Sequence, residues 1–230
     1  YWKGPGIVGV PTVIEWDLPD GFAASPLQWP APEKVDMVGI TANGYQGSAV
    51  LLTEITAPEK LARGTYHLHA KVAWMSCSTS CNPGMTTRTL QFIHDPDKDV
   101  EIESSTRLLF DSVRNEIPKL APESWIDSIS LPNEDTIVLK VAIPGIDQTW
   151  AAGLEFFCHD LQVDSNQETL VTWIHQDTGI FELTFTRPDF APRDPAVFSG
   201  VLKSSKEWPG MDSQFVEISI PWPKGTFRDE

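Results

Sequence analysis

The sequence has little cysteine, few basic residues and no long apolar run, and each shortage argues against a class of protein. Three cysteines in 230 residues are too few for a scaffold stapled by disulfides. Seventeen Lys and Arg against 32 Asp and Glu give a formal net charge of −15, which argues against a nucleic-acid-binding protein. No apolar run reaches the roughly 20 residues that span a bilayer, so the sequence predicts no transmembrane helix.

Familiar catalytic and cofactor motifs are also missing. There is no glycine-rich phosphate loop, no H-E-x-x-H and no G-x-S-x-G, so nucleotide-binding, zinc-protease and hydrolase functions have no support. The chain begins at Tyr1 without the charged and apolar regions of a signal peptide. From this we expect a trimmed or processed fragment.

The first hundred residues show the patterns of β structure. Short apolar runs at Thr12–Trp16 and Ala49–Ile55 are bounded by turn-forming residues, which predicts strands. Apolar and polar residues alternate over Tyr66–Trp74, as in a half-buried strand. Thr86–His94 is a second strand close behind it. We expect these two strands to form a hairpin, with Ser76–Gly84 as the connecting loop.

The period then changes to that of a helix. Leu109, Val113 and Ile117 recur every four residues, so we predict one helix within Ser104–Leu120, with Ser104 or Ser105 as its N-cap. Strand patterns resume after it, separated by loops that contain Pro, Asp, Asn or Gly. The predicted strands are Trp125–Leu131, Thr136–Ile143, Gly153–Cys158, Thr169–His175, Ile180–Thr186, Val197–Leu202 and Phe215–Ile220.

These patterns predict a mainly β protein with two immunoglobulin-like β-sandwich domains joined by one α-helix. We expect the first sandwich in residues 1–100, a linker helix in residues 101–122 and the second sandwich in residues 123–230.

Cys77 and Cys81 are the residues with the clearest chemistry. Two cysteines in a connection between neighbouring strands can bring their Cβ atoms within bridging distance. A disulfide that closes so short a loop removes little entropy from the unfolded chain, and short exposed disulfides tend to be easily reduced. The pair is therefore a candidate redox couple. Hydroxyl groups of Ser78, Thr79 and Ser80 are candidate hydrogen-bond donors to a thiolate.

Two other interpretations of the pair stay open at this point. The disulfide can be a passive loop bridge. Alternatively, both thiolates can bind soft copper(I), with additional ligands from Met75 or Met85 and from His67 or His69. The third cysteine, Cys158, lies in an apolar strand, and we expect a buried, idle thiol there. Trp2 and Trp16 are weak candidates for a docking surface.

The order and spacing of several short stretches resemble one known family. These stretches are Tyr1-Trp2-Lys3, Pro5-Gly6, Pro11, Ile14-Glu15-Trp16, Leu18-Pro19-Asp20-Gly21-Phe22, Trp29-Pro30-Ala31-Pro32, Gly44-Tyr45-Gln46-Gly47 and Trp74 through Cys77, Cys81 and Pro83. Together they make residues 1–95 resemble the N-terminal domain of the thiol:disulfide interchange protein DsbD, especially its ScsB-like branch. The resemblance continues more weakly through Phe110–Trp125, Phe156-Phe157 and Gly200-Val201-Leu202.

What the resemblance implies is a periplasmic protein-disulfide reductase. The domain would be the N-terminal ectodomain of an inner-membrane protein of a Gram-negative bacterium. It would take reducing equivalents from a membrane-embedded DsbD-type domain and pass them to periplasmic thioredoxin-like proteins, a pathway connected with cytochrome c biogenesis. It would need no cofactor, no metal and no nucleic acid.

The resemblance also assigns roles to residues. Cys81 matches the cysteine that forms mixed disulfides with partners, and Cys77 matches the resolving cysteine. Gly44, Tyr45, Gln46 and Gly47 match a cap loop whose aromatic ring covers the cysteines, while Trp74 and Pro83 support the cysteine loop. The acidic residues that precede the aromatic in the best-characterised branch are Ala42 and Asn43 here, which puts a carboxylate role at this position in doubt.

Overall fold

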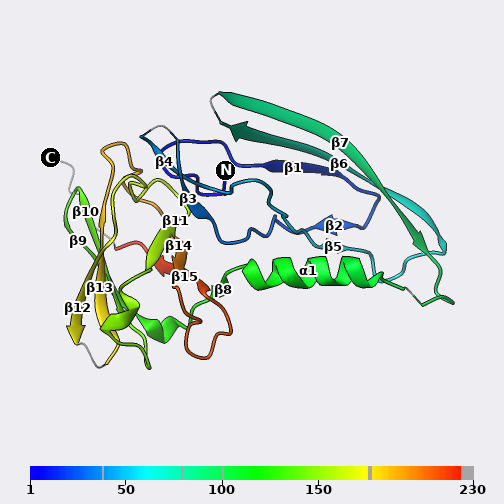
Figure 1. Cartoon of the computed structure of the whole chain (residues 1–230). Helices are drawn as coiled ribbons and strands as arrows, with labels where there is room; N and C mark the ends of the chain where they lie inside the picture. The colour runs from blue at the N-terminus through cyan, green and yellow to red at the C-terminus, as the bar shows by residue number, and fades with distance from the viewer. Residues whose placement is uncertain (38, 79, 100, 176–177, 224–230) are drawn as a thin grey trace.

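The structure is a computed structural model that describes residues 1–37, 39–78, 80–99, 101–175 and 178–223. Within these ranges it consists mainly of β strands, with one α-helix, α1 (Ser104–Glu116), and two short 3-10 helices, η1 (Glu123–Trp125) and η2 (Gln148–Trp150) (Figure 1). The predicted mainly β class is therefore confirmed. The immunoglobulin-like character of the sheets and the domain boundaries stay predictions. No helix in the described part is long and apolar enough to cross a membrane.

A long hairpin dominates the first part of the chain. Strands β6 (Gly64–Cys77) and β7 (Cys81–His94) pair residue for residue along their 14 positions, and β1 (Val13–Asp17) pairs antiparallel with the other edge of β6. Figure 1 shows the hairpin extending along the top of the molecule. Two small sheets lie beneath it: β2 (Ala23–Ala24) with β5 (Ile55–Thr56), and β3 (Glu33–Asp36) with β4 (Thr41–Gly44).

Two details of the predicted β structure are wrong. The segment Ser76–Gly84 is not a long loop, because the strands continue as far as Cys77 and Cys81. Cross-strand pairing along the whole hairpin overrides the low strand propensity of this Ser-, Asn- and Gly-rich stretch. Likewise, Ala49–Ile55 is not a strand. Leu52 makes an isolated bridge to Gln28, and only Ile55 reaches β5.

Helix α1 is shorter than predicted and has a different cap. Glu103 occupies the N-cap position, with no hydrogen bond from its side chain, so neither Ser104 nor Ser105 caps the helix. The helix ends at Glu116 because the residue before a proline is restricted to extended conformations, and Ile117, which precedes Pro118, is extended. Val113 is its buried residue.

The second part of the chain contains two four-stranded sheets. All seven predicted strands are present, with ends shifted by at most two residues. One sheet has the order β12-β13-β10-β9 and the other β11-β14-β15-β8. The strands are β8 (Lys119–Leu120), β9 (Ile126–Asn133), β10 (Thr136–Ala142), β11 (Glu155–Cys158), β12 (Leu170–His175), β13 (Ile180–Thr186), β14 (Val197–Lys203) and β15 (Phe215–Pro221).

The largest hydrophobic core lies between these two sheets. Leu139 of β10 and Leu183 of β13 are fully inaccessible to solvent. Phe185 of the first sheet packs against Phe156 and Phe198 of the second, with ring centroids 4.8 and 5.8 Å apart. Burial of these apolar faces is the main stabilising term for a sandwich of this kind.

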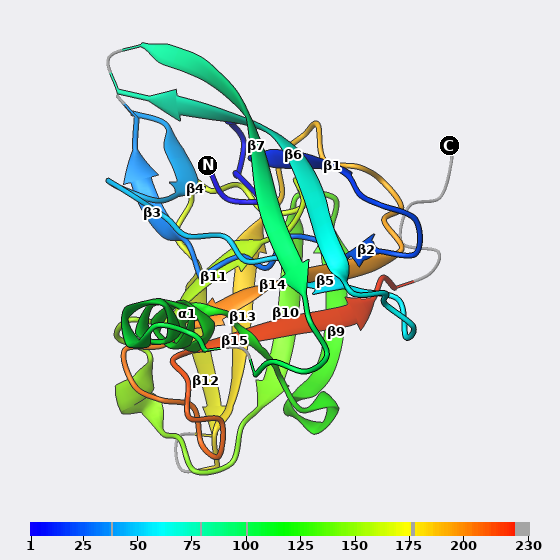
Figure 2. The same ribbon diagram turned by 90° about the vertical axis from the view of Figure 1, so that its right-hand side faces the viewer.

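A smaller hydrophobic cluster joins the first part of the chain to the second. Trp2 is completely buried in it, together with Trp29 from the first part and with Phe157 and Val201 from the second. The ring of Trp2 meets that of Phe157 edge-on at 6.3 Å. Trp2 is therefore not the exposed docking residue that the sequence suggested. Figure 2, turned by 90°, shows the N-terminus between the hairpin and the sheets formed by the second part.

The imidazole of His159 borders this junction and provides a pH-dependent prediction. Burial, with a smaller effect of the Lys3 charge, lowers the pKa of His159 to about 3. Glu217 lies 3.6 Å from its Nδ1 atom, but that carboxylate is shared with Lys3. Between pH 6.5 and pH 3 the unfolded chain therefore binds a proton at this position that the folded chain does not.

We expect this difference to lower the free energy of unfolding as the pH falls from 6.5, by up to about 1.4 kcal/mol for each pH unit. Urea denaturation of the wild type and of a His159→Gln variant at pH 6.5 and 4.5 measures it. The variant should lose less stability than the wild type on acidification, because the other titrating groups are common to both proteins. Equal losses would show that His159 does not couple folding to pH.

Candidate functional site

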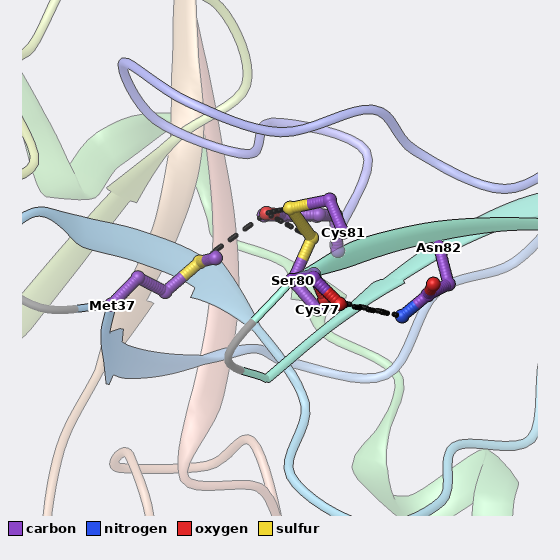
Figure 3. Close-up of a disulfide and its surroundings, with 6 residues drawn as sticks. Met37, Cys77, Ser80, Cys81 and Asn82 are labelled. Atoms are coloured by element: carbon purple, nitrogen blue, oxygen red, sulfur yellow. Dashed lines mark hydrogen bonds between the residues drawn. A yellow bond between two sulfur atoms is a disulfide. The ribbon is translucent and has the colours of Figure 1, made fainter.

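A disulfide joins Cys77 and Cys81 at the tip of the hairpin (Figure 3). The two residues face each other in the β6–β7 register, with their Cα atoms 4.1 Å apart. The Cys81 residue is exposed, whereas Cys77 is half-buried. An incoming group from solvent therefore reaches Cys81 more easily than Cys77.

Local packing supports this tip. The indole of Trp74 lies directly over Gly84, its partner across the hairpin, where a Cβ atom would come within 2.3 Å of the ring. Pro83 of β7 pairs with Met75 of β6. Because β7 is an edge strand, it tolerates a residue that has no backbone N–H. Asn82 donates a side-chain hydrogen bond to the carbonyl oxygen of Ser80 (Figure 3). Trp74 and Pro83 thus both lie in the strands that carry the cysteines.

A pocket of about 810 Å³ opens beside Cys77. Trp74 and Met75 of the hairpin form part of its wall, and the four residues Gly44, Tyr45, Gln46 and Gly47 form another part. Asp36 is the one residue with a charged side chain among those that line it, and Tyr1, which also lines it, carries an α-amino group whose pKa is lowered by burial. The structure therefore brings the predicted cap loop and Cys77 to the same, mostly apolar pocket.

The side chain of Tyr45 is directed elsewhere. Its hydroxyl group donates a 2.7 Å hydrogen bond to the carbonyl oxygen of Pro30, and its ring packs against the cluster around Trp2 and Trp29. Burial, followed by the Glu116 charge, raises the pKa of Tyr45 above its ordinary value. A cap formed by this residue stays a prediction.

The tyrosine that contacts the disulfide is Tyr1. Its hydroxyl oxygen lies 3.0 Å from Sγ of Cys77, to which it donates a hydrogen bond, and 3.8 Å from Sγ of Cys81. The thioether sulfur of Met37, at the turn between β3 and β4, is 3.3 Å from the same oxygen (Figure 3). Sequence reasoning missed Tyr1 because no local pattern connects residues that are 76 positions apart.

The N-terminal segment holds Tyr1 in this position. Trp2, the next residue, is anchored by the burial of its side chain, and it donates its backbone N–H to the carbonyl oxygen of Asn43. Asn43 is itself buried and bonds back to the segment, through its side chain to Gly4 and through its backbone to Pro5. The Tyr1 ring lies over Gly9, where a Cβ atom would come within 2.1 Å of it.

The expected donors in the turn do not serve the sulfurs. Among the residues that the structure describes, neither Ser78 nor Ser80 gives a hydrogen bond from its hydroxyl group to Cys77 or Cys81, and Thr79 lies outside those residues. Ser78 instead donates its backbone N–H to the carbonyl oxygen of Ser80. Tyr1 supplies the hydroxyl group that was expected from the turn.

The remaining candidate residues lie away from the disulfide or show no ligand geometry. Cys158 is a free, buried thiol, as expected, and burial raises its pKa well above the ordinary value. The imidazoles of His67 and His69 stack at 6.4 Å, both on the exposed face of β6. Within the described ranges, no three side chains of His, Cys, Asp or Glu are grouped so that they could hold a metal ion.

Comparison with known proteins agrees with this site. Residues 1–93 match the family described as "Thiol:disulfide interchange protein DsbD, N-terminal". Searches of curated proteins and of solved structures found no significant match. The matched segment contains the hairpin, the disulfide and the cap-loop residues. This match and the Cys77–Cys81 disulfide support a thiol–disulfide exchange domain in residues 1–93.

Proposed function

We propose that this protein is a periplasmic protein-disulfide reductase that carries electrons through the Cys77–Cys81 pair. It takes them from a membrane-embedded DsbD-type domain and passes them to periplasmic thioredoxin-like proteins. The observation that carries the proposal is the disulfide at the tip of the hairpin, with Cys81 exposed and Cys77 half-buried. The family match of residues 1–93 supports it.

The position of the disulfide suits a bond that is made and broken repeatedly. The bond joins residues only four positions apart, so its loss releases little entropy into the unfolded chain. The hairpin is held by the pairing of β6 with β7 along 14 positions. Reduction at the tip therefore leaves the main interactions of the fold in place.

The exchange proceeds in two steps. In the reduced domain, the Cys81 thiolate attacks one sulfur of a partner disulfide, forming an S–S bond to that sulfur and releasing the other partner sulfur as a thiolate. The Cys77 thiol, as its thiolate, then attacks Cys81 Sγ, which reforms the Cys77–Cys81 bond and releases the second partner thiolate. The partner gains two electrons, and the domain loses two.

Trapping of the mixed disulfide tests this assignment. We expect a reduced Cys77→Ser variant to form a stable mixed disulfide with an oxidised thioredoxin-like protein, because the resolving thiol is missing. A Cys81→Ser variant should trap nothing, because Cys77 is less accessible. Non-reducing gel electrophoresis and mass spectrometry detect the product. A Cys158→Ser variant is the control and should behave like wild type, whereas trapping by neither or by both cysteine variants would contradict the assignment.

The cap role of Tyr45 gives a second test. We expect Tyr45→Ala to speed the alkylation of reduced Cys81 severalfold, because the wall of the pocket beside Cys77 loses an aromatic ring. Tyr45→Phe is the matched control, since it removes only the hydroxyl group that bonds Pro30. Mass spectrometry after timed addition of iodoacetamide measures both rates. An unchanged rate in the alanine variant would remove the cap from the proposal.

One observation favours a second candidate function, that of a copper(I)-binding module. Met37 and Met75 line the same pocket as Cys77, and thioether and thiolate sulfurs are the ligands that copper(I) prefers. The Met37 sulfur shares the Tyr1 hydroxyl group with Cys77. Neither exposed Met85 nor the stacked imidazoles of His67 and His69 line this pocket.

Copper(I) titration separates the two functions. Under the exchange proposal, we expect a chelator such as bicinchoninate to remove copper(I) from the reduced protein, because disulfide exchange requires thiols that are free to react with a partner. Met37→Leu should leave disulfide exchange with a thioredoxin-like protein unchanged. Tight binding of one copper(I) that Met37→Leu weakens, together with no exchange activity, would favour the copper-binding function instead.

A further inference from the structure

We propose that Tyr1 is a third residue of the exchange site, whose hydroxyl group stabilises the Cys77 thiolate and so directs partners to Cys81. The inference rests on the exchange function proposed above and identifies the group that receives the negative charge. The first observation is the asymmetry of the contacts, 3.0 Å to Sγ of Cys77 against 3.8 Å to Sγ of Cys81. When the disulfide opens, the sulfur that already accepts the hydrogen bond is the better-stabilised leaving group.

The second observation is that the hairpin tip has no cation. Thiolates in proteins are usually stabilised by a neighbouring Lys, Arg or protonated His, or by a helix N-terminus. Residues 72–87 contain no charged residue and no histidine. In the part of the chain that the structure describes, Tyr1 is the one hydrogen-bond donor that reaches either sulfur of the disulfide.

The charged and titratable groups around the pair are few. Asp36, Tyr45 and Tyr1, which also carries the α-amino group, line the pocket beside Cys77. The carboxylate opposes the formation of a thiolate, and burial lowers the pKa of the α-amino group. Along the strands, the nearest cations are Lys71, which faces Glu15, and Arg88, which donates to the hydroxyl group of Thr86. Both are at least six residues from the cysteines, or about 20 Å along a strand. Among these groups, the Tyr1 hydroxyl group is the one that lies within hydrogen-bond distance of a cysteine sulfur.

The hydrogen bond from Tyr1 to Cys77 is stronger in the reduced state than in the disulfide. The hydroxyl group has one proton and two sulfur acceptors, Sδ of Met37 and Sγ of Cys77. Both a thioether and a disulfide sulfur are weak acceptors, whereas a thiolate is a strong, charged one. Burial raises the pKa of Tyr1, so the group keeps its proton. Reduction therefore transfers the hydrogen bond fully to Cys77.

In the step itself, atoms and electrons balance. A thiolate of the electron-donating partner attacks Sγ of Cys81 and forms a new S–S bond. The Cys77–Cys81 bond breaks, and its electron pair goes to Sγ of Cys77, where the Tyr1 hydroxyl group stabilises the charge without giving up its proton. A second partner thiol then resolves the mixed disulfide, which leaves the domain with two reduced cysteines.

Tyr1→Phe tests the inference, because it keeps the ring over Gly9 and removes only the hydroxyl group. The variant is made in the Cys81→Ser background, where half-buried Cys77 is the more accessible of the two remaining thiols and buried Cys158 reacts slowly. The measurement is the rate of alkylation by iodoacetamide as a function of pH. Loss of a hydrogen bond to a charged sulfur should move the midpoint of the profile up by about one pH unit, or about tenfold in acid constant.

Two matched variants separate this effect from packing. Tyr45→Phe removes a hydroxyl group that bonds Pro30 and does not contact either cysteine sulfur. Met37→Leu removes the thioether sulfur that shares the Tyr1 hydroxyl group and keeps a side chain of similar size. We expect both to keep the unsubstituted profile. In proteins with both cysteines, Tyr1→Phe should also shift the equilibrium with glutathione at pH 8 toward the disulfide, by up to about tenfold.

The inference is overturned if Tyr1→Phe leaves the profile unchanged, or if Met37→Leu moves it equally, since the cause would then be packing. These outcomes are distinct from failure of the proposed function. If Cys77→Ser traps no partner, the exchange function fails, while the pH profile of Cys77 still decides whether Tyr1 stabilises its thiolate.

Discussion

The arrangement of the site depends on the burial of one side chain, that of Trp2. An indole of this size removes roughly 200 Å² from water when it is fully buried, which corresponds to roughly 5 kcal/mol. The surfaces that bury it include Phe157 and Val201 in the second part of the chain. This contact fixes the segment that carries Tyr1 and places its hydroxyl group against a disulfide formed by residues far along the chain.

This dependence gives the second half of the chain a role that its sequence does not suggest. The sandwich formed by β8–β15 has, among its described residues, no group of three His, Cys, Asp or Glu side chains that could hold a metal ion, and its cysteine is buried. It nevertheless provides much of the surface on which the N-terminal segment lies. Ser165, for example, accepts a hydrogen bond from the backbone N–H of Ile7 and donates one to the carbonyl oxygen of Thr41, which ties the N-terminal segment and β4 to the second part. The second part therefore acts as a support for the chemistry of the first.

Local patterns predicted much of the fold. The alternation in Tyr66–Trp74 located the inner strand of the hairpin, and the runs after α1 located seven strands, because each pattern reflects one buried face. The strand ends at Cys77 and Cys81 were not predictable in this way, since pairing with the opposite strand, and not residue preference, extends them. The run at Ala49–Ile55 failed for the converse reason: its composition suits a strand, but Val50 stays exposed and only Leu52 finds a bridging partner.

The candidate site divides in the same way. Cys77 and Cys81 were evident from the sequence because their spacing carries the chemistry. Tyr1 and Met37 were not, because Tyr1 reaches the sulfurs, and Met37 reaches Tyr1, through tertiary contacts that leave no periodic signal. The buried Asn43, in turn, stands where the resemblance expected acidic residues, and it bonds the N-terminal segment. A position that holds a carboxylate in the best-characterised branch of the family thus holds an amide here, which positions the segment that carries Tyr1.

The absence of charge from residues 72–87 has a consequence for recognition. Long-range attraction between oppositely charged surfaces speeds association, but it also selects partners by their charge. Because the tip is neutral in a protein with a net charge of −15, selection of partners by their charge depends on the surface outside the tip. The function proposed above requires a donor and an acceptor to be engaged in alternation, and under that proposal the same uncharged end of the hairpin is presented to both without electrostatic preference for either.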